Sequence, residues 1–268
     1  MSEEKKVTVA TLRKKKLEGK KIVTLTAYDY FTSRLLNQAG IDLILVGDSL
    51  GNVVLGYENT IPVTMADMLH HTRAVVRGNS RCLVVADMPF LSCEINEEEA
   101  LRNAGRLIQE GGAGAVKLEG GREVAALVKR LVQAGIPVLG HIGLLPQDIL
   151  QEGAYRVQGR DEESSASLIA DGQALEEAGA FGVVLECVAA RTAGEITKSL
   201  KIPTIGIGSG PLCDGQILVV YDLLGLYGSV RPKFAKPYAD LQTAMLKAFA
   251  GYKKEVEEGI FPGEEHSF

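Results

Sequence analysis

Short runs of apolar residues recur along the chain, and each run is bounded by glycine, proline or small polar residues. Continuous apolar runs of about four to eight residues are typical of strands that are buried on both faces of a sheet. On this pattern we predict eight strands, at residues 22–28, 43–48, 83–88, 115–120, 137–142, 181–187, 202–207 and 216–221.

Amphipathic stretches separate most of these runs, as at residues 97–109, 123–134 and 162–178. A recurring phrase joins a helix end, a turn of small residues and an apolar strand, as in NQAGIDLILVG, QEGGAGAVKLE, VQAGIPVLG and EEAGAFGVVLE. Glycine at the end of a helix adopts the left-handed conformation that other residues resist. Four copies of this phrase indicate repeated βα units and hence a parallel sheet.

Eight βα units predict an α/β fold, namely a single-domain (β/α)8 TIM barrel over residues 1–268. Residues 238–258 have the pattern of an amphipathic helix, so a C-terminal helix and tail are expected at about 238–268. A doubly wound open sheet is the alternative, weakened because no G-x-G-x-x-G motif follows the first strand. Residues 144–161 form a polar connection that is long enough to serve as a lid.

The composition, 46% hydrophobic and 24% charged, is typical of a soluble globular protein. Acidic residues outnumber basic ones by 34 to 29, and the densest basic stretch, residues 13–16, is predicted to be a solvated helix face. Neither nucleic acid nor a membrane is therefore expected as a partner. The four cysteines lack CxxC spacing, which predicts free thiols. No apolar run suits a signal peptide or membrane span, so a cytoplasmic protein is expected.

Polar residues stand at the ends of several predicted strands, where a TIM barrel places its active site. These residues are Asp48, Ser49, Asp87, Lys117, Glu119, His141 and Glu186. An unpaired carboxylate at the end of a buried strand is strongly disfavoured. Asp48 and Asp87, with Glu119 on a neighbouring strand, therefore predict a site for a hard divalent cation, Mg²⁺ above all. Helix capping is the alternative for each aspartate.

The other candidates leave more than one role open. Lys117 suits a Schiff base, a fixed cation for a substrate carboxylate, or an ion pair with Glu119 or another neighbour. Glu186 suits a general base in a partly dry pocket, or an ion pair with a basic residue. His141 suits a ligand, a hydrogen-bond donor or a buried core histidine. The glycine-rich residues 206–210 are only a weak signal for phosphate binding.

Ordered phrases along nearly the whole chain resemble the ketopantoate hydroxymethyltransferase family. The phrases are LTAYDY (25–30), VGDSLG (46–51), PVTMADMLHHTRAVVRG (62–78), ADMPF (86–90), VKLEGG (116–121), GHIGLLPQ (140–147), YRVQGR (155–160), VLEC (184–187), IPTIGIGSG (202–210) and CDGQILV (213–219). Departures from the family's phrases, at Leu145, Asp148, Ala189 and Ser209, touch loops around the pocket and replace no predicted catalytic group.

The resemblance implies a TIM barrel that assembles into a homo-oligomer, usually a decamer. It implies Mg²⁺-dependent transfer of a one-carbon unit from 5,10-methylenetetrahydrofolate to 3-methyl-2-oxobutanoate. The product is 2-dehydropantoate (ketopantoate), for pantothenate and coenzyme A synthesis. A Mg²⁺-dependent 2-oxo acid aldolase or lyase of the phosphoenolpyruvate-binding barrel type, which works without folate, is the alternative. A non-catalytic barrel would be expected to lack some of the strand-end polar residues, and none is lacking.

The matching motifs also imply roles for individual residues. Asp48, Asp87 and Glu119 are similar to the family's metal ligands, Glu119 either directly or through water. Glu186 is similar to the proton acceptor. Substrate-binding groups are implied at Asp48, Ser49, Asp87, Lys117 and His141.

Overall fold

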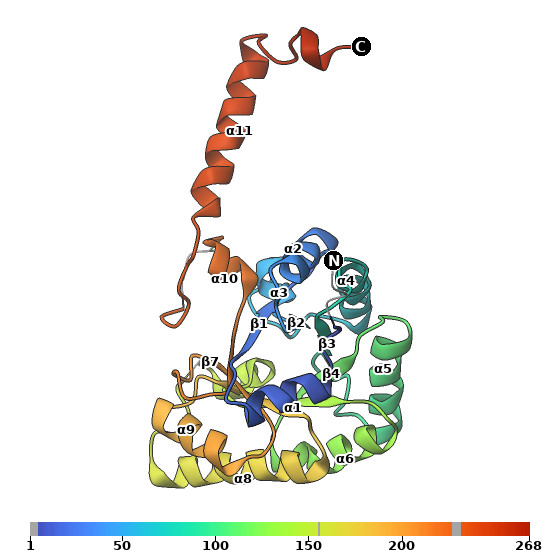
Figure 1. Ribbon diagram of the computed structural model, residues 1–268, viewed down its shortest axis with the longest axis vertical. Coiled ribbons are helices and arrows are strands. Elements are labelled where there is room, and N and C mark those ends of the chain that lie inside the picture. Colours follow the sequence, from blue (N-terminus) through green and yellow to red (C-terminus); the bar gives the residue numbers. More distant parts are fainter. Residues whose placement is uncertain (1–4, 155, 227–231) are drawn as a thin grey trace. The chain divides into compact units, whose positions relative to one another are not determined.

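The computed structural model describes residues 5–154, 156–226 and 232–268, and the chain divides into two compact units, Met1–Val219 and Val220–Phe268. The first unit is a closed barrel of eight parallel strands in sequence order (Figure 1). The strands are β1 (Ile22–Thr26), β2 (Leu43–Val46), β3 (Leu83–Asp87), β4 (Ala115–Glu119), β5 (Val138–Gly143), β6 (Gly182–Glu186), β7 (Thr204–Ile207) and β8 (Gly215–Leu218).

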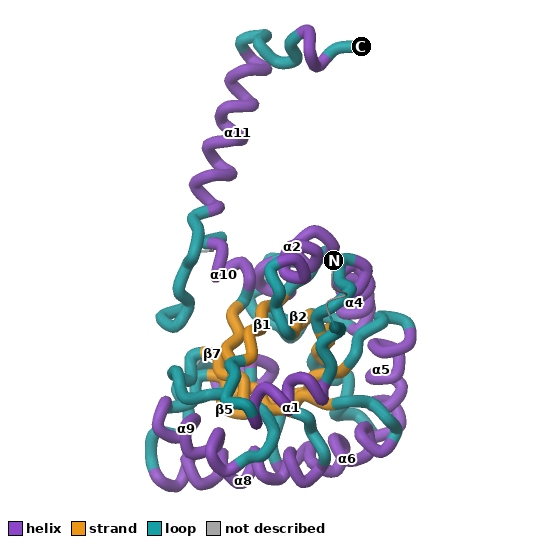
Figure 2. The backbone as a smooth tube through the Cα atoms, viewed as in Figure 1, coloured by secondary structure: helices purple, strands orange, loops and turns teal. Residues whose placement is uncertain are grey.

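All eight predicted strands are present, and the predicted TIM barrel is confirmed. Pairing of β8 with β1 closes the sheet, which rules out the open-sheet alternative. Figure 2 shows the strands of this unit surrounded by helices. The prediction of a single domain over residues 1–268 stays a prediction.

Helices follow most strands of the first unit. They are α1 (Val9–Leu17), α2 (Tyr30–Gln38), α3 (Leu50–Val53), α4 (Met65–Arg77), α5 (Glu97–Gln109), α6 (Ala125–Gln133), α7 (Ile149–Glu152), α8 (Glu162–Ala178) and α9 (Ala190–Ser199), with the short 3-10 helices η1 (Arg122–Val124) and η2 (Pro146–Asp148). The predictions at 97–109 and 162–178 match α5 and α8. The stretch at 123–134 is divided between η1 and α6, and η1 begins immediately after the turn at Gly121.

The barrel interior is filled by alternate residues of the strands, because successive side chains of a strand point to opposite faces. The interior cluster is Val7, Leu12, Ile22, Leu43, Leu45, Leu83, Val85, Ala115, Leu139, Phe181, Val184, Ile205, Ile207 and Ile217. Leu12 places α1 in this cluster, so α1 closes one end of the barrel.

Two lysines attach α1 to the strands. The Lys15 ammonium lies 2.6 Å from both carboxylate oxygens of Asp42, and the Lys16 ammonium lies 2.7 Å from Asp214. The prediction that residues 13–16 form a solvated helix face is therefore wrong for these two lysines. The sequence alone suggested a solvated face because the acidic partner of Lys16, Asp214, is 198 residues away along the chain.

The second unit contains α10 (Val220–Leu224), α11 (Leu241–Glu257) and η3 (Glu264–His266). Helix α11 confirms the predicted C-terminal helix, and it begins after Asp240, whose side chain accepts a hydrogen bond from the Thr243 N–H. No residue of α11 is buried.

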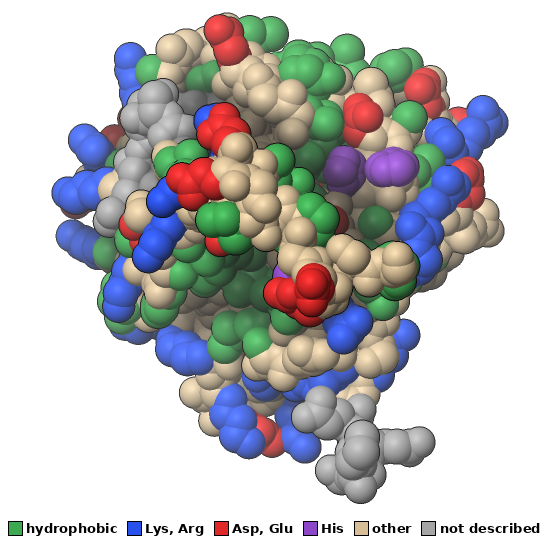
Figure 3. All heavy atoms as spheres, turned by 90° about the horizontal axis from the view of Figure 1, so that it is seen from above, with side chains coloured by type: hydrophobic (Ala, Val, Ile, Leu, Met, Phe, Trp, Pro, Cys, Tyr) green, Lys and Arg blue, Asp and Glu red, His purple; other side chains and the backbone are tan. Residues whose placement is uncertain are grey.

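The cysteines, the apolar character of the helices and the surface charges bear on the remaining predictions. The four cysteines are free thiols, as predicted. None of the helices in the described ranges is long and apolar enough to cross a membrane. On the face shown in Figure 3, basic side chains lie in small groups among acidic, hydrophobic and other side chains.

Candidate active site

Five of the strand-end polar residues point into the barrel. Ala115 belongs to the interior cluster, so the alternation of side chains also turns Lys117 and Glu119 of β4 inward. Asp87, Glu119 and Glu186 are the last residues of β3, β4 and β6. Three more candidates stand two residues after a member of the interior cluster and therefore also point inward. They are Asp87 after Val85, His141 after Leu139, and Glu186 after Val184.

Lys117 is a buried lysine in this group, with only 4% of its surface exposed. Strand register pairs it with Asp87, and its Nζ lies 2.5 Å from Asp87 Oδ1 and 3.9 Å from Glu119 Oε1. Burial alone would lower the pKa of Lys117, but the neighbouring carboxylates more than offset burial and raise it. A Schiff-base lysine needs a neutral amine, so this arrangement favours the fixed cation.

Asp48 and Asp87 lie next to each other beyond β2 and at the end of β3. The Asp48 N–H donates to Asp87 Oδ2 at 3.1 Å, and both side chains are buried. Burial, with the charges of Asp87 and Glu119, raises the pKa of Asp48 to about 8. Burial also raises the pKa of Asp87, against the opposing effect of Lys117. Carboxyl groups crowded in this way favour a bound cation, because its charge offsets their repulsion.

His141 lies between two glutamates. Its Nδ1 is 3.3 Å from Glu119 Oε1 and its Nε2 is 3.3 Å from Glu186 Oε2, although neither nitrogen completes a hydrogen bond to a described residue. Burial and Lys117 lower the pKa of His141, but the two glutamates raise it to about 9. Burial would raise the pKa of Glu119, yet His141, Lys117 and a backbone N–H lower it. The opposite pKa shifts of His141 and Glu119 therefore favour a protonated His141 beside an ionised Glu119.

The carboxylate oxygens of Asp48, Asp87 and Glu119 are the candidate ligands for Mg²⁺. Within the described residues, no three His, Cys, Asp or Glu side chains are arranged to hold a metal ion by themselves. Mg²⁺, however, is usually bound through one or two carboxylates, with water and substrate oxygens in its other positions. Asp48 and Asp87 offer two carboxylates, and the buried Oε1 of Glu119 has no hydrogen-bond partner in the described ranges. These residues are therefore compatible with Mg²⁺.

Ser49 is the remaining predicted site residue, and it contacts a residue that the sequence did not single out. The phenol oxygen of Tyr28 lies 2.9 Å from Ser49 Oγ, and Tyr28 is only 2% exposed. Tyr28 follows β1, so it also lies beyond the carboxyl end of a strand. The only sequence signal for Tyr28 is its place in the phrase LTAYDY.

Gln147 is the second residue that sequence reasoning missed. Its Nε2 donates to Asp48 Oδ2 at 2.8 Å and to the Met88 carbonyl at 3.0 Å. Its backbone N–H donates to Glu119 Oε2 at 3.1 Å. Gln147 belongs to η2, within the connection that we predicted as a lid. Its only sequence signal is that it ends the phrase GHIGLLPQ.

The predicted lid, residues 144–161, is attached next to Glu186. The Leu144 N–H donates to the Glu186 carbonyl at 2.8 Å, and the Gln158 N–H donates to the Cys187 carbonyl at 2.9 Å. Within this connection, Tyr155 lies outside the described residues. The connection therefore begins and returns beside the candidate base.

The glycine-rich segment 206–210 has a structural role. Ser209 is completely buried, its hydroxyl donates to the Leu185 carbonyl at 2.7 Å, and it accepts the Val188 N–H at 3.0 Å. Gly208 and Gly210 have φ angles of 65° and 77°, a conformation that side chains other than glycine resist. The segment fixes the backbone after β6, which explains its glycines without a phosphate.

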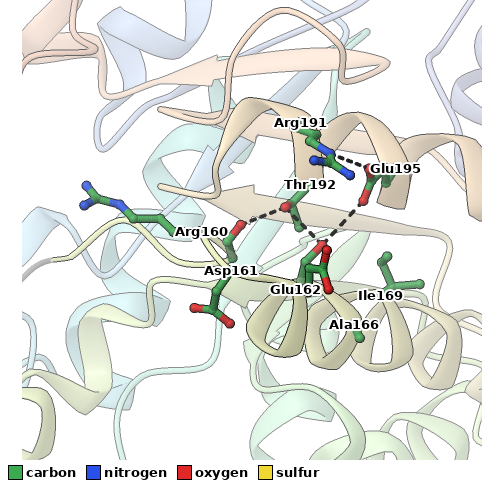
Figure 4. A pocket seen from close by; sticks show the side chains of 10 residues that line it. Arg160, Asp161, Glu162, Ala166, Ile169, Arg191, Thr192 and Glu195 are labelled. Atoms are coloured by element: carbon green, nitrogen blue, oxygen red, sulfur yellow. Dashed lines mark hydrogen bonds and ion pairs between the residues drawn. The ribbon is translucent and has the colours of Figure 1, made fainter.

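A separate cavity of about 370 Å³ lies between the first turns of α8 and α9 and contains none of the predicted site residues (Figure 4). Arg191 forms an ion pair with Glu195 at 3.0 Å, and the Thr192 hydroxyl donates to the Gly159 carbonyl at 2.7 Å. Arg160 extends away from the other labelled side chains. The basic groups at this cavity are thus either paired or turned outward.

The sequence is similar to known proteins along nearly its whole length. It matches the profile of the family described as Ketopantoate hydroxymethyltransferase over residues 6–264. It is 56% identical over 265 residues to a 3-methyl-2-oxobutanoate hydroxymethyltransferase of Thermoanaerobacter sp. (strain X514), covering 99% of this chain and 97% of the relative. It is also 56% identical to the enzyme of that name from Moorella thermoacetica, over the full length of both chains.

Solved structures show the same fold at low sequence identity. A crystal structure of 2,3-dimethylmalate lyase, a member of the PEP mutase/isocitrate lyase superfamily, superposes with a TM-score of 0.61. It is 20% identical, and the match covers 98% of this chain and 92% of that one. At this identity the similarity concerns the barrel fold alone.

Proposed function

Because the chain belongs to the ketopantoate hydroxymethyltransferase family, we propose that it transfers a hydroxymethyl group from 5,10-methylenetetrahydrofolate to 3-methyl-2-oxobutanoate in a Mg²⁺-dependent reaction. The product is ketopantoate (2-dehydropantoate), and this is a committed step of pantothenate and coenzyme A biosynthesis. One observation carries the proposal: two buried carboxylates, a buried lysine and a separate glutamate lie close together at one end of the barrel.

Asp48 and Asp87 would hold Mg²⁺, with Glu119 bound directly or through water. When bound, Mg²⁺ supplies a Lewis acid that polarises the 2-oxo group of the substrate. Lys117 is a fixed positive charge beside these carboxylates and can balance the negative charge of the oxo acid. Ser49, held by Tyr28, can donate a hydrogen bond to the same substrate.

Glu186 would accept the proton from C3 of the oxo acid. It comes from β6, two strands beyond β4, so it is on a different strand from the groups that bind the oxygens. His141 Nε2 lies 3.3 Å from its Oε2, so the imidazole lies beside the carboxylate that would accept the proton. C3 would then bond to the methylene carbon of the donor as the first of its two C–N bonds breaks. Water would replace the second nitrogen and supply the hydroxyl group, and the two freed nitrogens take up the proton from C3 and one proton from water.

The test is formation of ketopantoate by the purified protein from the oxo acid and the folate donor, with and without a chelator. We expect product only when the donor is present, loss of activity on chelation, and recovery with Mg²⁺. Turnover of 2-oxo acids without the donor would instead indicate the aldolase or lyase. Substrate-dependent trapping of Lys117 by borohydride would indicate a Schiff base. The homodecamer and the cytoplasmic location stay predictions.

A further inference from the structure

Gln147 uses all of its hydrogen-bond donors on the candidate metal site. It is 6% exposed and comes from η2, whereas its three acceptors follow or end three other elements: Asp48 follows β2, Met88 follows β3 and Glu119 ends β4. One residue of the connection therefore links the ends of three successive strands.

The orientation of the Gln147 amide is fixed by the chemistry of its partners. The Met88 backbone carbonyl can only accept a hydrogen bond, so the amide nitrogen, and not the oxygen, must face Met88 and the neighbouring Asp48. Both amide hydrogens are then engaged. The hydrogen bond is made to Oδ2 of Asp48 at 2.8 Å, so it restrains the orientation of this carboxyl group.

The backbone at the two ends of the connection has a different set of partners. Leu144 and Gln158 donate to the carbonyls of Glu186 and Cys187, and the Ala189 N–H donates back to Gln158 at 2.9 Å. The two ends are thus attached beside the candidate base, while Gln147 reaches the carboxylates on the other side of the site. If the connection lifts, the contacts with Asp48 and Glu119 are lost together.

We propose that Gln147 is a positioning residue that couples the packing of η2 against the strand ends to Mg²⁺ affinity. It holds Asp48 and Glu119 in the arrangement that binds the cation only while η2 is packed against them. The inference rests on the proposed function, because that function supplies the cation. Residues that orient metal ligands typically change metal affinity by about 10- to 100-fold when mutated. By thermodynamic reciprocity, Mg²⁺ must then stabilise this packing of η2 to the same extent.

The experiment measures binding of Mg²⁺ alone by calorimetry, and of Mn²⁺ by spin resonance, to wild type, Gln147→Met and Gln158→Met. Methionine has a similar volume to glutamine but no amide, and Gln158 is a matched control in the same connection. We expect Gln147→Met to weaken binding about ten-fold or more, and Gln158→Met to leave it within about two-fold. Saturating Mg²⁺ should restore much of the turnover of Gln147→Met, which a general loss of structure would not allow.

Hydrogen exchange provides the reciprocal measurement. Mg²⁺ should slow amide exchange in residues 144–154 of wild type, and should slow it much less in Gln147→Met. Equal affinity of wild type and Gln147→Met, or an equal loss in Gln158→Met, would overturn the inference while leaving the proposed function intact. A wild type that binds no Mg²⁺ would overturn both. If Gln147→Met does not fold, Gln147→Asn is measured instead, since its shorter amide cannot reach both acceptors and the same weakening is expected.

Discussion

Replacement of Lys117 by methionine removes the buried cation while keeping an unbranched side chain. The wild-type ammonium lies 2.5 Å from Asp87 and 3.9 Å from Glu119, and side-chain exposure is 5% for Lys117 and 3% for Asp87. At an effective dielectric constant of about 20, a charge pair near 4 Å is worth about 4 kcal/mol before desolvation is counted. Breaking a buried pair from one side typically costs about 3–5 kcal/mol, because the partner charge is left alone. We expect a loss of this size in the free energy of unfolding.

The assay is denaturant unfolding with a chelator and again with Mg²⁺. Mg²⁺ should stabilise Lys117→Met more than wild type, because a positive neighbour of the cation site is gone. Lys15→Met is the matched control: it breaks the pair with Asp42 at the other end of the barrel, so it should lose stability without any added dependence on Mg²⁺. A loss below about 1 kcal/mol, or equal stabilisation of wild type and Lys117→Met by Mg²⁺, would refute the reasoning.

Three further outcomes are expected. Glu186→Gln should slow exchange of the C3 proton of 3-methyl-2-oxobutanoate by about 10²- to 10⁴-fold, followed by NMR in deuterated water, while binding of the oxo acid persists; full exchange would remove Glu186 as the base. Tyr28→Phe should raise KM for the oxo acid about five-fold through Ser49, which corresponds to about 1 kcal/mol; additive effects of Tyr28→Phe and Ser49→Ala would contradict this coupling. Burial raises the pKa of the Cys187 thiol to about 11, so its alkylation by iodoacetamide should accelerate about ten-fold per pH unit from pH 8 to 10 as thiolate forms; a plateau near pH 9 would disagree.

The positions of the strands could be predicted because burial of both faces leaves a continuous apolar run, and such runs need no knowledge of distant partners. The inward direction of Lys117 and Glu119 follows from the same local rule, since alternate residues share a side and Ala115 is packed inside. The barrel itself follows from repetition of one βα unit.

Pairings between strands and connections were harder to predict. The main partner of Lys117 is Asp87 on the neighbouring strand, although Glu119, two residues along the chain, was the nearer candidate in sequence. Gln147 and Tyr28 are ordinary polar residues until the path of the chain brings them to Asp48 and Ser49. These contacts depend on the register and on the course of a long connection, and neither leaves a pattern in residue type or spacing.

The attachment of α1 also affects the protein while it is being synthesised. Lys16 of α1 forms an ion pair with Asp214, and β1 pairs with β8. The first part of the barrel is therefore complete only when the last part has been made. Until residues beyond 214 leave the ribosome, the nascent chain carries an open sheet edge, and Lys16 lacks Asp214. Contacts this distant in sequence form late in folding, and exposed strand edges promote association between chains. We therefore expect chaperone dependence to be greatest for chains that stop just short of β8.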